Sequence, residues 1–103
     1  MRIPDLKKKS EKQIETILRN GVKNLGGRAY KFTSPAHRSV PDRLILLPER
    51  RIYFTEVKTL DGELTALQAK EIDFLRGLGF SADALYGEDE VRQFLKELEH
   101  GSI

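Results

Sequence analysis

The stretch DRLILLPERRIYFTEVK, residues 42–58, contains two strand-like segments joined by a short turn. Residues 42–47 and 52–58 are rich in the apolar, β-branched and aromatic types that favour strands. Only the turn-like segment PERR, residues 48–51, separates them, and a connection this short joins antiparallel neighbours. The sequence therefore predicts a β-hairpin. Its first strand is apolar on both faces from Leu44 onward, so we expect it inside a sheet.

The second strand of this hairpin ends in an acid and a base. Residues two apart on a strand share a face, so Glu56 and Lys58 follow Ile52 and Phe54 on one face. Charged side chains at the end of an apolar face indicate that another group interacts with them.

Folding the hairpin brings Asp42 beside Glu56. With the turn centred between residues 49 and 50, Asp42 lies opposite Val57, and a shift of half a residue moves the pairing by one. Cross-strand Cβ atoms are ~4.5–5.5 Å apart when opposite and ~7–8 Å when diagonal, which lets two carboxylates share a hard cation such as Mg²⁺. The Val57 carbonyl is a further candidate ligand, and Lys58 could contact a phosphate or orient the attacking water. Each residue alone is also an ordinary strand-end residue, but the combination predicts metal-assisted phosphodiester hydrolysis.

The rest of the chain predicts an α/β fold, with a mixed sheet of about four strands flanked by helices. Two capping boxes, Ser10 with Gln13 and Thr65 with Gln68, each open a helix. The predicted elements are a helix from residue 10 to the glycines at 26–27, strands at 28–32, 42–47 and 52–58, a helix from 65 to 79, a strand at 81–86 and a helix at 89–99. The predicted buried positions are Ile14, Ile17, Leu18 and Val22 in the first helix, Leu67, Phe74, Leu75 and Leu78 in the second, and Val91, Phe94, Leu95 and Leu98 in the third.

Composition sets broad limits. A chain of 103 residues predicts one domain, here residues 10–103 behind a basic lead-in at residues 1–9. Cysteine is absent, which excludes disulfides and thiolate metal sites. No apolar run approaches membrane-spanning length, so we expect a cytoplasmic protein. A net charge of +2 and a pI of about 9.0 hint only weakly at nucleic acid.

Pro41-Asp42 followed by Glu56-Val57-Lys58 resembles the motif of the PD-(D/E)xK (restriction endonuclease-like) superfamily, whose αβββαβ core matches the predicted order of elements. The likeness is closer to its VRR-NUC branch, which includes stand-alone phage and bacterial members. It extends from Ser10 to Phe80, through SEKQIETIL, LGGRAYKFTSP, VPDRLILLP, YFTEVKTLDGELTALQ and FLRGLGF. One departure is Ser39, which stands where the branch has glycine two residues before the proline.

The resemblance implies a DNA endonuclease that depends on Mg²⁺ or Mn²⁺. It implies Asp42 and Glu56 as metal ligands, Lys58 as the catalytic lysine and an acid from the first helix as a further ligand. Glu11 is favoured for that acid, with Glu15 in reserve, although an acid in a first helical turn is also ordinary. Gln68 matches a glutamine typical of the branch, and its place in a capping box explains it equally well.

Substrate and partners are also expectations. Lys31, Arg38 and Arg43 are candidate DNA contacts, with Arg43 pointing to the face opposite Asp42's. The resemblance implies action on branched DNA, as in Holliday junction resolvases that work as homodimers on four-way junctions. The alternatives are a flap-type nuclease acting with a replication or repair partner, a non-catalytic DNA-binding module, and a structural adaptor that uses the last helix.

Overall fold

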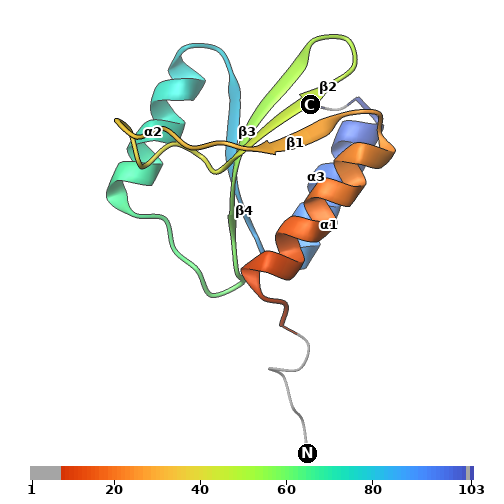
Figure 1. Cartoon of the computed structure of the whole chain (residues 1–103), viewed down its shortest axis with the longest axis horizontal. Coiled ribbons are helices and arrows are strands. Elements are labelled where there is room, and N and C mark those ends of the chain that lie inside the picture. Colours follow the sequence, from red (N-terminus) through yellow and green to blue (C-terminus); the bar gives the residue numbers. More distant parts are fainter. Residues whose placement is uncertain (1–7, 102) are drawn as a thin grey trace, which may run out of the picture.

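The computed structural model describes residues 8–101 and 103, so most of the predicted lead-in at residues 1–9 lies outside the described residues. The fold is the predicted α/β class, a four-stranded sheet with three helices (Figure 1). In chain order the elements are α1 (Glu11–Asn24), β1 (Arg28–Lys31), β2 (Arg43–Leu47), β3 (Arg51–Lys58), α2 (Ala66–Gly77), β4 (Ser81–Tyr86) and α3 (Gly87–Glu99).

Both predicted capping boxes are present, and they fix where α1 and α2 begin. The Ser10 hydroxyl accepts from the Gln13 N–H at 3.2 Å, and the Gln13 side chain accepts from the Ser10 N–H at 2.8 Å. Thr65 and Gln68 make the same exchange at 3.1 and 2.9 Å. Each box satisfies two backbone donors that the first helical turn leaves without an intrahelical partner.

The sheet has the strand order β1-β2-β3-β4, in which β1, β2 and β3 are antiparallel neighbours and β4 runs parallel to β3 after the α2 crossover. Arg43 pairs with Thr55, and one further step sets Asp42 opposite Glu56. The register centred between residues 49 and 50 is therefore wrong by one residue, because the turn centres on Glu49. That Asp42 comes beside Glu56 is confirmed.

Helices α1 and α3 lie side by side over one face of the sheet (Figure 1). Their apolar faces form the core with β2 and β3, as predicted for the first and last helices. The fully or largely buried helix positions are Ile14, Leu18 and Val22 in α1 and Val91, Phe94 and Leu98 in α3. The two helices approach closely at Gly21, where a Cβ atom would lie 2.3 Å from a Leu95 methyl carbon. This packing anchors α1 and hence the acids that it carries towards the sheet, Glu11 and Glu15.

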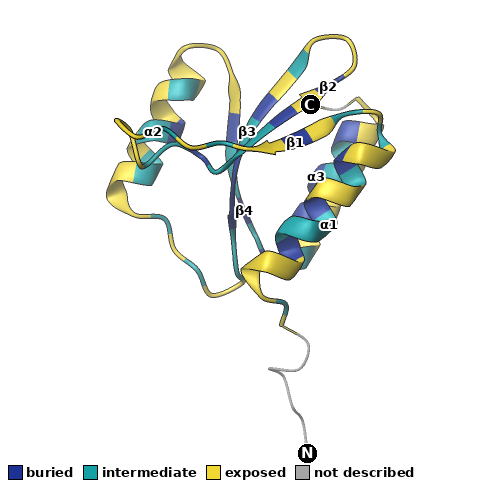
Figure 2. Ribbon diagram, viewed as in Figure 1, coloured by how far each residue is buried: buried dark blue, intermediate teal, exposed yellow. Residues whose placement is uncertain are grey.

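The buried face predicted for α2 is wrong at Leu67, Phe74 and Leu78, whereas Leu75 is half-buried. Leu67, Phe74 and Leu78 are 66%, 60% and 58% exposed, and the residue that α2 buries is Ile72. The physical reason is that α2 is the one described helix on its face of the sheet, where it packs beside β4 (Figure 2). A helix without a neighbour buries only the narrow strip that touches the sheet.

Candidate active site

The candidate site lies where β2 begins and β3 ends. The Asp42 Oδ1 accepts a hydrogen bond from the Val57 N–H at 3.4 Å, which holds the carboxylate across the two strands. Glu56 is 6% exposed, on the face that also carries Phe54. The Lys58 Nζ lies 4.0 Å from a Glu56 carboxylate oxygen. The hairpin thus brings together Asp42, Glu56 and Lys58.

The carboxyl groups of Asp42 and Glu56 both have a raised pKa. Burial, then the charge of Asp42, raises the pKa of Glu56 from its usual 4.5 to about 7, against the opposing effect of Lys58. Burial, then the charge of Glu15, also raises the pKa of Asp42, while its hydrogen bond from Val57 lowers it. A cation bound between these two carboxyl groups would stabilise their ionised forms.

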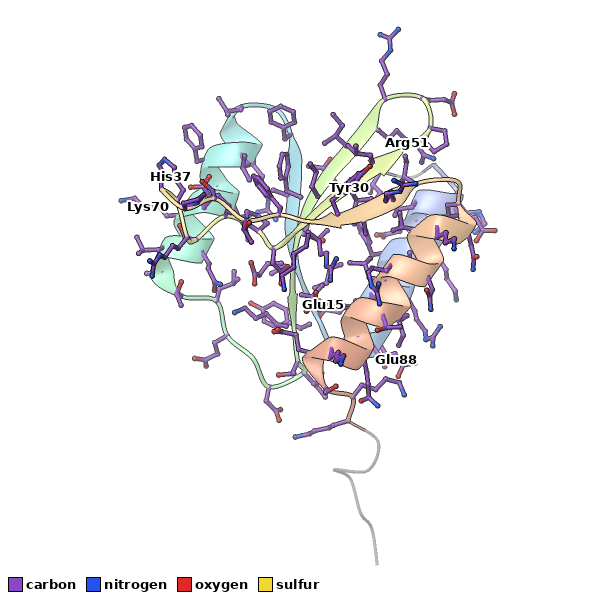
Figure 3. All side chains as sticks on the ribbon, viewed as in Figure 1. Glu15, Tyr30, His37, Arg51, Lys70 and Glu88 are labelled. Atoms are coloured by element: carbon purple, nitrogen blue, oxygen red, sulfur yellow. The ribbon has the colours of Figure 1, made fainter. Side chains whose placement is uncertain are left out.

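Helix α1 adds its acids to this site. Carboxylate oxygens of Glu11, Glu15 and Asp42 all lie within 4.8 Å of one another. The two helical acids differ in their surroundings. Glu15, labelled in Figure 3, accepts from the Arg43 Nε at 2.9 Å and from its Nη2 at 2.7 Å, both on one oxygen. Glu11 is exposed, and no ion pair to it is found among residues 8–101.

The charge of Glu11 acts on both strand carboxylates, since it raises the pKa of Asp42 and that of Glu56. Glu15 acts more strongly on Asp42, but it is not among the main causes of the shift at Glu56. Glu11 thus has both strand acids within electrostatic reach, whereas Glu15 lies on the Arg43 side of Asp42.

The remaining predicted residues divide between two hollows, one on each side of Asp42. A cleft of about 230 Å³ contains Arg38 and Gln68 together with Asp42 and Glu56, and Phe32, Thr33, Ser34 and Val40 complete it. Lys31 and Arg43 lie in the second hollow, beside α1. Gln68 faces the cleft while its side chain serves the capping box. Ser39 is not among the residues with positive φ, so its backbone does not require the glycine of the related pattern.

The pairing of Glu15 with Arg43 is the feature that sequence reasoning missed. Arg43 was expected to contact DNA, yet its guanidinium is largely buried against Glu15 and also donates to the Ala29 carbonyl at 3.4 Å. The available signal was alternation along the strand: Arg43 follows Asp42, so it points to the opposite face, where the first helix packs.

The donor set fits a hard divalent cation. Asp42, Glu56 and the α1 acids offer only oxygen, which Mg²⁺ and Mn²⁺ prefer. The paired carboxylates would lose their mutual repulsion on binding one. The cluster of Glu11, Glu15 and Asp42 is consistent with a site for a divalent metal.

Comparison with known proteins gives the chain its family. No protein-family model matches it. A solved structure described as a VRR_NUC domain superposes with a TM-score of 0.77 at 25% identity, over 87% of this chain and 95% of the other. "Putative nuclease p44" of Acyrthosiphon pisum secondary endosymbiont phage 1 is 42% identical over 79 residues, which are 77% of this chain and 85% of the relative.

The chain belongs to the VRR-NUC family of nucleases. A second solved structure, described as a VRR_NUC domain protein, has a TM-score of 0.66 at 21% identity, covers 88% of each chain and supports the fold. The resemblance read from the motif is thereby confirmed. Among residues 8–101, none of the helices combines the length and apolar character needed to cross a membrane.

Proposed function

We propose that this VRR-NUC protein is a DNA endonuclease that depends on a divalent metal. The observation that carries the proposal is the largely buried Glu56 carboxylate beside Asp42, with the Lys58 ammonium 4.0 Å away. Binding to DNA alone would need neither carboxylate, because acids near phosphate are unfavourable without a cation. The same three groups suit hydrolysis of a phosphodiester.

Each residue has a proposed role. Asp42, Glu56, Glu11 and the Val57 carbonyl would hold Mg²⁺ or Mn²⁺. The bound metal would polarise the phosphate and lower the pKa of water. Lys58 would stabilise the negative charge that develops on the phosphate oxygens, or orient the attacking water.

Two further residues support the site from the cleft. Arg38 is exposed there and suits a phosphate next to the cut. Gln68 stabilises the start of α2 through the capping box and so maintains the wall of the cleft that α2 forms. Arg43 acts through Glu15, by neutralising it, more than through DNA.

We further propose a homodimer that acts on branched DNA, with the four-way junction as the preferred substrate. Two identical sites related by a two-fold axis suit cuts on opposing strands. Support for a dimer comes from Leu67, Phe74 and Leu78, which are exposed and spaced to share one side of α2. A second copy is the occupant that this stripe fits.

The charges on α2 also match a second copy. If two α2 helices pack antiparallel so that Leu67 faces Phe74 of the other copy, Lys70 faces Glu71 of the other copy. Apolar contacts and opposite charges then agree in a single register. The first turn of α2 also carries Gln68, so this arrangement sets a candidate site on each side of the axis.

Cleavage of labelled DNA tests the catalytic proposal. A four-way junction, a flap, a linear duplex and a single strand would be incubated with Mg²⁺, with Mn²⁺ and with chelator. We expect paired symmetric nicks in the junction. Asp42→Asn, Glu56→Gln and Lys58→Ala should each lower cleavage at least about 100-fold, whereas the matched variants Glu99→Gln and Lys96→Ala should not.

The outcomes separate the alternatives. Metal-dependent cutting of other forms would keep the nuclease and replace the substrate, and a flap preference would favour the flap-type alternative. Tight junction binding with no cutting of any form would identify a non-catalytic DNA-binding module. Full activity in one of the three variants would remove that residue from the catalytic set.

Light scattering, which measures the mass of the particle in solution, tests the dimer in variants whose charges at residues 70 and 71 are reversed. Lys70→Glu and Glu71→Lys should each weaken dimerisation, because each sets like charges opposite one another. The double variant should restore it, which simple damage to α2 would not do. A monomer for the wild-type protein at all concentrations, or no rescue in the double variant, would reject this interface while leaving the nuclease proposal intact.

A further inference from the structure

A second hollow lies on the α1 side of Asp42, away from the cleft that holds Arg38. It has a volume of about 370 Å³ and brings together exposed cations from two elements, Lys12 and Arg19 of α1 and Lys31 of β1. Its acids are Glu11 and Glu15, and Arg43 pairs with Glu15. Lys12 and Arg19 are not among the residues that the motif singled out.

The fold itself does not require these cations. No ion pair to Lys12, Arg19 or Lys31 occurs within residues 8–101, although six ion pairs are found there. Lys12 lies in the first turn of α1, where the helix dipole disfavours a positive charge. The one side-chain hydrogen bond found for Arg19 among the described residues is long, at 3.4 Å to the Thr16 hydroxyl. Their positions are explained better by an external anion.

The hollow adjoins the candidate metal centre. Glu15, which lines it, has a carboxylate oxygen within 4.8 Å of one on Asp42. A DNA strand presents a phosphate about every 3.4 Å of helix axis. Cations that line a hollow beside the metal centre are therefore placed to meet phosphates further along the same strand. Because Arg43 pairs with Glu15, that acid repels such a phosphate less.

We infer that Lys12, Arg19 and Lys31 bind backbone phosphates of the cut strand on one side of the scissile bond. The cleft that contains Arg38 then binds the DNA strand on the opposite side of the scissile bond. The strand thus passes Asp42 on its way from one hollow to the other. The inference rests on the proposed nuclease function and adds the path of the substrate. Such contacts are independent of sequence and sensitive to salt.

Binding measured without cutting is the first test. A fluorescent four-way junction would be titrated with the Glu56→Gln protein in Mg²⁺ over a series of KCl concentrations. Adding Lys12→Gln and Arg19→Gln should weaken binding about 10-fold or more at low salt and reduce the slope of log K against log salt by roughly 1–2, since each phosphate contact contributes about 0.9. Lys96→Gln is the matched control, because Lys96 is an exposed helical lysine and no described residue forms an ion pair with it. An unchanged slope would overturn the inference.

The side of the contact is tested with single neutral methylphosphonates placed at each position around the mapped cut in DNA. In the wild-type protein, replacement of a phosphate on one side should slow cleavage several-fold. That penalty should vanish in the Lys12→Gln, Arg19→Gln protein and persist in Lys96→Gln. Equal penalties in all three proteins would overturn the inference while cleavage itself upholds the nuclease. Failure of the wild type to cut DNA would instead reject the proposed function, and the salt slope would still decide whether these cations meet phosphate.

Discussion

The two faces of the sheet differ in how they are covered. On the face of α1 and α3, Ile14, Leu18, Val22 and Val91 are at most 1% exposed. On the face of α2, the aromatic rings of Phe32, Phe54 and Phe80 follow one another at centroid distances of 5.9 and 5.6 Å, and Phe80 is 42% exposed. Two helices cover the first face of the sheet, whereas one helix covers the second face and leaves it partly open.

The candidate site lies where the two faces meet. Glu56 belongs to the open face and lines its cleft, while Asp42 also reaches the acids of α1 on the covered face. The packed face therefore supplies stability and anchors α1, whereas the open face leaves room for a substrate and a partner. Substitutions on the two faces should therefore differ in their effects.

Truncation of a core residue should separate the faces most clearly. Leu18→Ala removes a side chain that is 0% exposed and should lower the free energy of unfolding by about 2–5 kcal/mol. Leu67→Ala, on the open face, should change it by less than about 0.5 kcal/mol in dilute protein. Urea unfolding followed by circular dichroism measures both. Similar losses in the two variants would contradict this difference between the faces.

A divalent cation should stabilise the folded protein through the site. At a free Mg²⁺ concentration about 100 times its dissociation constant, the free energy of unfolding should rise by ~2.7 kcal/mol. Glu56→Gln should lose most of this gain because it removes a carboxylate ligand, and Glu99→Gln should keep it. Thermal melts with Mg²⁺ and with chelator measure the effect. An equal gain in Glu56→Gln would place the cation elsewhere.

The metal-free protein should lose stability as the pH rises from about 4.5 to 7. The folded-state pKa of Glu56 is about 7 against a usual 4.5, so the folded protein holds a proton that the unfolded chain releases across this window. Other acids titrate as well, so the informative quantity is the difference from Glu56→Gln. At pH 8 that variant should be more stable than the wild type by on the order of 1–2 kcal/mol. Urea unfolding in chelator at several pH values measures it, and an equal or lower stability would contradict the prediction.

The hairpin tip should give the smallest effect. Arg50 has a φ of 62°, a left-handed conformation that glycine adopts at lower cost than other residues. Arg50→Gly should therefore raise the free energy of unfolding by about 0.5–1 kcal/mol, with no change in cleavage. Arg50→Ala, which keeps the Cβ atom, is the control and should give no gain. A loss of activity in Arg50→Gly would link the tip to the site.

Much of the fold was predictable because its signals are local. The two capping boxes, the hairpin and the apolar periodicity of α1 and α3 each depend on residues close in the chain. The buried face of α2 was not predictable in this way. Leu67, Phe74 and Leu78 have helical spacing, but periodicity does not say whether a second element lies against that side.

The gathering of Asp42, Glu56 and Lys58 could be predicted from the sequence, because one short hairpin sets their spacing. The family could be predicted too, from motifs in register along most of the chain. The pairing of Arg43 with Glu15, and the shared hollow of Lys12, Arg19 and Lys31, could be seen only in the folded protein. These contacts join α1 to the sheet across long stretches of chain, so they depend on how α1 packs against α3 and the strands rather than on any local pattern.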